Sequence, residues 1–214
     1  SIIPIIFDIP LYRERYRFFV AKEDLKIEFI HINFDVGSEE KVKVFCTTKY
    51  RVLRNDPLLE IPFRNIFGET ANFKAKIDNK AIRPEVLKQG TETKGVKRLT
   101  DKNKGDTFIL DLEATFLGDA EKINRKDDGL GFWLNYYKCK QLKLQVIFPR
   151  HFDPKNVRFV AGDADFKSEM KDKFGAIKTP VLCSVNRRKV EWLIDYPKFS
   201  KGYWIRWSWD EIST

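Results

Sequence analysis

The sequence is poor in the residues from which catalytic and metal-binding sites are most often built. It holds two histidines and three cysteines, Cys46, Cys139 and Cys183, and the cysteines form no C-x-x-C pair. Their odd number and wide spacing argue against a disulfide framework and a zinc ribbon. We therefore expect reduced thiols that pack as small apolar groups, and a cytoplasmic location.

Familiar catalytic motifs are missing as well. No G-x-x-x-x-G-K-[ST], G-x-G-x-x-G, G-x-S-x-G or H-E-x-x-H occurs, so the common nucleoside triphosphatases, dinucleotide enzymes, α/β-hydrolases and zinc proteases are unsupported. His31 stands between Ile30 and Ile32 and is expected at an outward strand position, and His151 in a two-proline turn. We predict no enzyme activity, cofactor or metal, although a pair of carboxylates that meets only in three dimensions stays open.

No apolar run is long enough to cross a membrane, and no signal peptide is visible. The chain begins with Ser1, and its only methionine is Met170. This beginning indicates a domain excised from a larger protein, whose other part would be an effector or a membrane segment. The localisation prediction is therefore cytoplasmic, with the soluble part of a membrane-associated protein as the alternative.

What is present is an aromatic-rich alternating pattern over 214 residues, 43% of them hydrophobic and 14% aromatic. Alternation of apolar with polar residues predicts half-buried strands at 107–116, 142–148 and 73–77. We predict a mainly β fold: an antiparallel β-sandwich, or partly closed barrel, of about ten strands with one or two short helices. The whole chain is expected to be one β domain, 1–214, with 118–131 as the junction if there are two lobes.

Turn signals divide this pattern into hairpins. Residues 26–53 are predicted to form a hairpin around Gly37-Ser38, with a bulge near Phe29, where the apolar phase slips by one residue. Asp78-Asn79 predicts a second tight turn, because these residues tolerate positive φ. Short helices are expected at 166–174 and, as an alternative to a strand, at 11–20. Long loops are expected at 86–106 and 118–131.

The net charge of +9 and the pI near 9.3 favour anionic partners. Basic residues concentrate in the expected loops, with a further basic turn at 122–126. If the loops converge, these residues would form an anion-binding funnel. The alternative is that the basic side chains are simply solvated. Exposed Trp133, Tyr136 and Tyr137 would add base stacking for nucleic acid, unless they lie in the core. The candidate ligand-binding residues are Lys94, Lys97, Arg98, Lys102, Lys104, Arg187, Arg188 and Lys189.

The C-terminal segment is the most distinctive part of the chain. Tyr203, Ile205, Trp207 and Trp209 share one strand face and Trp204 lies on the other, so we expect the closing hairpin of a sandwich or barrel. The pattern W-x-I-x-x-P, a spacer and G-Y-x-I-x-W is formed by Trp192, Ile194, Pro197, Gly202, Tyr203, Ile205 and Trp207. It resembles the end of immunoglobulin-like β-sandwich modules of bacterial signalling and antiphage-defence proteins.

The resemblance implies ligand sensing or protein interaction without catalysis, and it transfers no functional residue. Together with the charge, it predicts a sensor or interaction module that binds an anionic small molecule, such as a nucleotide second messenger, through its basic loops. The alternatives are a nucleic-acid-binding β domain and a structural or assembly domain that forms a homo-oligomer.

Overall fold

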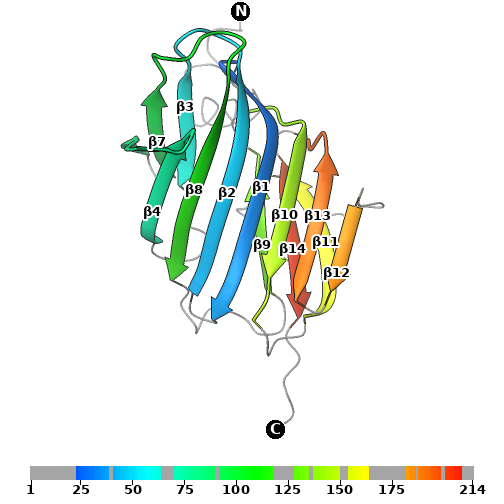
Figure 1. Cartoon of the computed structure of the whole chain (residues 1–214). Coiled ribbons are helices and arrows are strands. Elements are labelled where there is room, and N and C mark those ends of the chain that lie inside the picture. The colour runs from blue at the N-terminus through cyan, green and yellow to red at the C-terminus, as the bar shows by residue number, and fades with distance from the viewer. Residues whose placement is uncertain are drawn as a thin grey trace, which may run out of the picture.

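In the residues that it describes, a computed structural model shows fourteen strands in three sheets (Figure 1). In the part of the chain that the structure describes, strands are the only regular secondary structure, which confirms the mainly β prediction. Both expected helices and the 122–126 turn lie outside that part. The described residues are 23–38, 41–63, 70–89, 92–117, 128–134, 137–149, 154–163, 182–186, 188–198 and 201–208.

The largest sheet has eight strands in the order β12-β13-β10-β1-β2-β8-β4-β5. Neighbouring strands run antiparallel, except that β1 and β10 are parallel. The predicted hairpin is confirmed as β1–β2, and its register shifts between Ile27 and Phe29, where the bulge was expected. The strands are β1 Leu25–Ser38, β2 Lys41–Val52, β4 Thr70–Ile77, β5 Lys80–Ile82, β8 Thr107–Leu117, β10 Gln141–Ile147, β12 Leu182–Asn186 and β13 Lys189–Asp195.

Two three-stranded sheets complete the fold, in the orders β11-β14-β9 and β3-β7-β6. Figure 1 shows β9, β14 and β11 behind the β10–β13 half of the large sheet, and β3 and β7 toward its β4 side. Residues of all three sheets contribute to one apolar core. The strands are β3 Leu58–Phe63, β6 Glu85–Gln89, β7 Glu92–Arg98, β9 Asp128–Trp133, β11 Lys155–Asp163 and β14 Lys201–Ser208.

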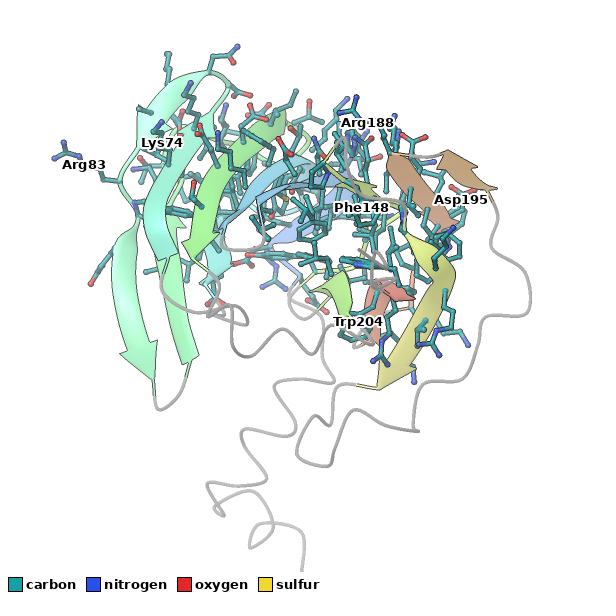
Figure 2. All side chains as sticks on the ribbon, turned by 90° about the horizontal axis from the view of Figure 1, so that it is seen from below. Lys74, Arg83, Phe148, Arg188, Asp195 and Trp204 are labelled. Atoms are coloured by element: carbon teal, nitrogen blue, oxygen red, sulfur yellow. The ribbon has the colours of Figure 1, made fainter. Side chains whose placement is uncertain are left out.

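Aromatic contacts join the large sheet to the β11-β14-β9 sheet. Phe148, directly after β10, meets Trp207 of β14 edge-to-face, with ring centroids 4.9 Å apart. Trp192 of β13 meets Tyr203 of β14 with centroids 5.8 Å apart. All four side chains are buried, and such pairs add to the stabilisation from burial alone. Figure 2 shows Phe148 between the two layers.

The prediction of a loop at 86–106 is wrong for the first part of that segment, which forms the hairpin β6–β7. Lysine, threonine and glutamate dominate this segment, so the apolar alternation that marks a strand is weak. β7 lies between β3 and β6, and hydrogen bonding on both edges stabilises it whatever its side-chain pattern. The second expected loop also ends earlier than predicted, because β9 begins at Asp128.

The predicted closing hairpin at the C-terminus is wrong as well. β13 lies in the large sheet, whereas β14 pairs with β11 and β9 in the small one. The two strands therefore face each other across the core instead of pairing edge to edge. Tyr203, Ile205 and Trp207 do share the buried face, as predicted, and Trp209 lies outside the described residues.

Trp204 covers the outer face of its small sheet. Figure 2 shows it on the side away from Phe148. A Cβ placed on Gly202 would lie 1.6 Å from the indole Cη2, and one placed on Gly131 would lie 2.3 Å from its Cδ1. The indole thus lies flat against two glycines on neighbouring strands, and it is buried there.

The Tyr137 hydroxyl anchors the β3-β7-β6 sheet to the rest of the molecule. It accepts a hydrogen bond from the Glu60 backbone amide at 3.0 Å and donates one to the Leu58 carbonyl at 3.1 Å. β3 is an edge strand, so this hydroxyl satisfies backbone groups that a neighbouring strand would otherwise satisfy. The ring packs edge-to-face on Tyr50 of β2, with centroids 5.6 Å apart.

We expect Tyr137→Phe to lower the free energy of unfolding by about 1–3 kcal/mol, because it leaves the buried Glu60 amide without its hydroxyl partner. Urea denaturation followed by circular dichroism measures this. Tyr196→Phe is the matched control, since Tyr196 is 77% exposed, and it should change little. Equal stability of the two variants would contradict the anchoring role.

We expect Gly202→Ala to destabilise the protein by about 1–3 kcal/mol, because the new methyl group displaces the Trp204 indole. Near-ultraviolet circular dichroism and urea denaturation report the change. The same substitution in a Trp204→Ala background should cost clearly less, since the clashing ring is then absent. A cost that is independent of Trp204 would show that the constraint lies in the backbone.

Candidate anion-binding surface

The structure places the predicted binding residues in two groups. Lys97 and Arg98 end β7, and Lys102 and Lys104 lie in the following connection, which hydrogen-bonds to the end of β2 through Gly105 and Val52. Lys94 also belongs to β7, opposite Pro62, but its side chain lies outside the described part, as does Arg187.

The second group, Arg188 and Lys189, lies at the turn between β12 and β13, at the other end of the large sheet. Lys189 is opposite Ile147, which in turn is opposite Asp35 near the end of β1. The first group lies near Leu25, where β1 begins. The length of β1 between Leu25 and Asp35 separates the groups by roughly 30 Å. These described residues therefore do not converge on one funnel (Figure 1).

Several of the predicted side chains are held by partners within the protein. Lys102 Nζ lies 2.9 Å from Asp78 Oδ2, and Arg98 donates to the Asp56 carbonyl. The end of the sheet near Lys102 is also balanced in charge. Its basic side chains are Arg54, Lys80, Lys97, Arg98, Lys102 and Lys104, and its acidic ones are Glu23, Asp24, Asp56, Asp78, Asp101 and Asp106.

The Lys102–Asp78 pair has a structural role. Asp78 and Asn79 form the predicted tight turn between β4 and β5, with φ of 48° and 66°, as a type I′ hairpin requires. The other carboxylate oxygen of Asp78 accepts the Ile109 amide at 2.9 Å. These bonds and Lys102 hold the pKa of Asp78 below its usual value against the opposing effect of burial. The Ile109 amide thus fixes the β4–β5 turn to β8, and Lys102 fixes it to the connection between β7 and β8.

Lys189 is also held by an ion pair within the protein. Lys189 and Lys143 lie 2.5 and 3.0 Å from Glu191 Oε1, and the hydrogen bond from Lys189 is the main cause that lowers the pKa of Glu191 to about 2. His31, opposite Lys143 across β1 and β10, points to the face opposite the core, as predicted. Burial, together with the nearby Lys143, lowers the pKa of His31.

The cations of the β4–β5 hairpin are ones that the prediction missed. Lys76, Lys80 and Arg83 are exposed and form no ion pair within the described residues. Lys76 and Arg83 line a hollow of about 410 Å³ at the β5 edge of the large sheet. The Lys-x-Lys alternation at 74–76 was visible in the sequence, but it indicated only a solvated strand face.

Other chemistry is sparse in the described part of the chain. No group of three or more His, Cys, Asp or Glu side chains there could hold a metal ion. Cys46 and Cys139 are free thiols, as expected, and burial raises their pKa values to about 11 and about 12. Tyr137 is buried in the core rather than available for stacking on a base. The described part of the chain contains no helix that is long and apolar enough to cross a membrane.

We expect Glu191→Gln to lower the free energy of unfolding at neutral pH by about 1–2 kcal/mol. The lowered pKa of Glu191 means that its contribution is complete above its usual value of 4.5 and is lost as pH falls toward about 2. The difference between wild type and variant should therefore disappear over that range in urea denaturation. Exposed Glu85→Gln is the control, and a pH-independent difference would contradict the pairing.

Comparisons with known proteins define the fold but no family. No family model matches the sequence, and no curated protein matches it. A Legionella pneumophila protein with an ascribed nutrient-binding role is similar over 88% of this chain and 68% of its own, with a TM-score of 0.56 and 11% identity. Yeast LTA4 hydrolase in complex with bestatin is similar over 92% of this chain, with a TM-score of 0.50 and 12% identity.

This chain spans about a third of the hydrolase, 32% of its length. At such identities the likeness shows a shared fold alone. The resemblance of the C-terminal segment to immunoglobulin-like modules stays a prediction. The fold of this chain is thus one that also occurs as part of longer proteins.

Proposed function

We propose that this chain is a non-enzymatic sensor or interaction module that binds an anionic ligand, a class that includes nucleotide second messengers. The observation that carries the proposal is the set of exposed cations without a protein partner in the described residues. On the β4–β5 hairpin these are Lys76, Lys80 and Arg83. Exposed Lys104 and half-buried Lys97 are also without an ion pair there.

Unpaired cations suit binding for an energetic reason. A lysine already paired with a carboxylate must give up that partner before it can meet a ligand, whereas an unpaired one loses only water. The net charge of +9 adds long-range attraction for anions. Hence the binding surface is expected on the β4–β5 side of the large sheet, and the paired Lys102 and Lys189 serve the fold.

We also propose a cytoplasmic location. The free thiols of Cys46 and Cys139 support it, because a reducing compartment keeps such thiols unpaired. The high pKa values of both thiols limit thiolate formation near neutral pH, so neither is expected to act as a nucleophile.

Titration calorimetry tests the anion-binding proposal. The probes are a cyclic dinucleotide, a single-stranded oligonucleotide and an acidic polypeptide, each at low and at high salt. At least one should bind, with affinity that falls several-fold at high salt because the contacts are exposed charge pairs.

Binding of the oligonucleotide alone would identify a nucleic-acid-binding domain instead of a sensor. Failure of all three probes would overturn the proposal. A defined oligomer in light scattering together with that failure would favour the assembly domain.

A further inference from the structure

The hollow at the edge of the large sheet is formed where the chain passes from one sheet to another. β5 pairs with β4 only along Ala75–Ile77 of β4. The chain then leaves through Arg83 and Pro84 to enter β6, which belongs to the β3-β7-β6 sheet. The departure leaves a hollow of about 410 Å³ lined by Phe73, Lys74, Ala75, Lys76, Ala81, Ile82, Arg83 and Pro84.

The hollow combines an apolar floor with a cationic rim. Phe73, Ala75 and Ile82 supply apolar surface, and Phe73 and Ile82 also pack against the core. Exposed Lys76 and Arg83 are without ion pairs in the described residues. Figure 2 shows Lys74 and Arg83 at the same edge of the sheet, with Arg83 pointing away from it.

Lys74 is the one rim cation with an acidic partner. Its Nζ lies 3.6 Å from Glu113 Oε1, and the two side chains are 65% and 46% exposed. An ion pair this open to water contributes little, so an acidic ligand can compete for Lys74. The lining residues therefore offer three cations to a ligand and include no acidic side chain, and Asp111 and Glu113 of the neighbouring β8 are the acidic groups opposite Lys76 and Lys74.

We propose that this hollow is the docking site for an extended acidic polypeptide segment in which acidic and apolar residues alternate. In an extended segment, successive side chains point in opposite directions. One set would then meet the apolar floor while the other meets Lys74, Lys76 and Arg83. This inference rests on the anion-binding function and names its site and partner class.

The features of the hollow favour a peptide over a nucleotide. A base needs an exposed aromatic face on which to stack, and Phe73, the aromatic side chain among the lining residues, packs against the core. The segment is held by side chains rather than as a strand added to β5, because β5 is only three residues long and Pro84 lacks an amide hydrogen.

Fluorescence anisotropy with a short labelled peptide of alternating Glu and Leu tests this docking. We expect Lys76→Glu with Arg83→Glu to weaken binding about tenfold, since two attractive contacts become repulsive. Lys138→Glu with Lys198→Glu changes the net charge equally at two exposed sites near β10 and β13, on the other side of the large sheet from the hollow, and it should alter affinity less than twofold. A Glu-Ser peptide should bind more weakly than the Glu-Leu peptide, because it lacks groups for the apolar floor.

Three outcomes would overturn the docking site but leave the anion-binding function standing. The first is an equal loss of peptide affinity in the hollow variant and in the control variant. The second is a loss of affinity only in the Lys97→Glu, Lys104→Glu variant. The third is that the protein binds a cyclic dinucleotide or an oligonucleotide but does not bind the peptide. If no anion binds, the broader function fails as well. Near-ultraviolet circular dichroism of each variant confirms that it folds.

Discussion

The packing of Trp192 and Phe148 against Tyr203 and Trp207 is the contact on which the rest of the structure depends. A sheet with one apolar face is stable in water only if another layer covers that face. The small β11-β14-β9 sheet does so on one half of the large sheet, and Tyr137 fastens the β3-β7-β6 sheet to the other half. The burial of these large side chains also accounts for the separation of β13 from β14, because their apolar faces must meet across the core.

The opposite face of the large sheet consequently carries the polar side chains. Cations there follow one of two patterns. Lys143 and Lys189 share the carboxylate of Glu191, whereas Lys76 lies on the same face of the sheet without such a partner in the described residues. The first pattern stabilises strand pairing. The second leaves charge available to a ligand, and Lys76 and Arg83 are examples at the place where β5 ends and the chain leaves the sheet.

Local patterns predicted those parts of the fold that depend on local physics. Alternation at 107–116 predicted β8, and the phase slip near Phe29 predicted the bulge in β1. Asp78-Asn79 predicted a turn, because its conformation depends on two residues alone. The strand β7 was missed, since its stability comes from pairing with β3 and β6 and not from its own apolar pattern.

The amino-acid sequence by itself determined the mainly β character, the free thiols and the excess of positive charge. Composition and alternation express these properties directly, because each depends on individual residues or on near neighbours. Only the tertiary structure decided which cations have partners. Lys102 meets Asp78, and Lys189 meets Glu191, through strand pairing and turn placement, whereas Arg83 is left exposed. Charge density along a sequence cannot distinguish a cation held by the fold from one open to a ligand, because the distance to the nearest carboxylate is set in three dimensions.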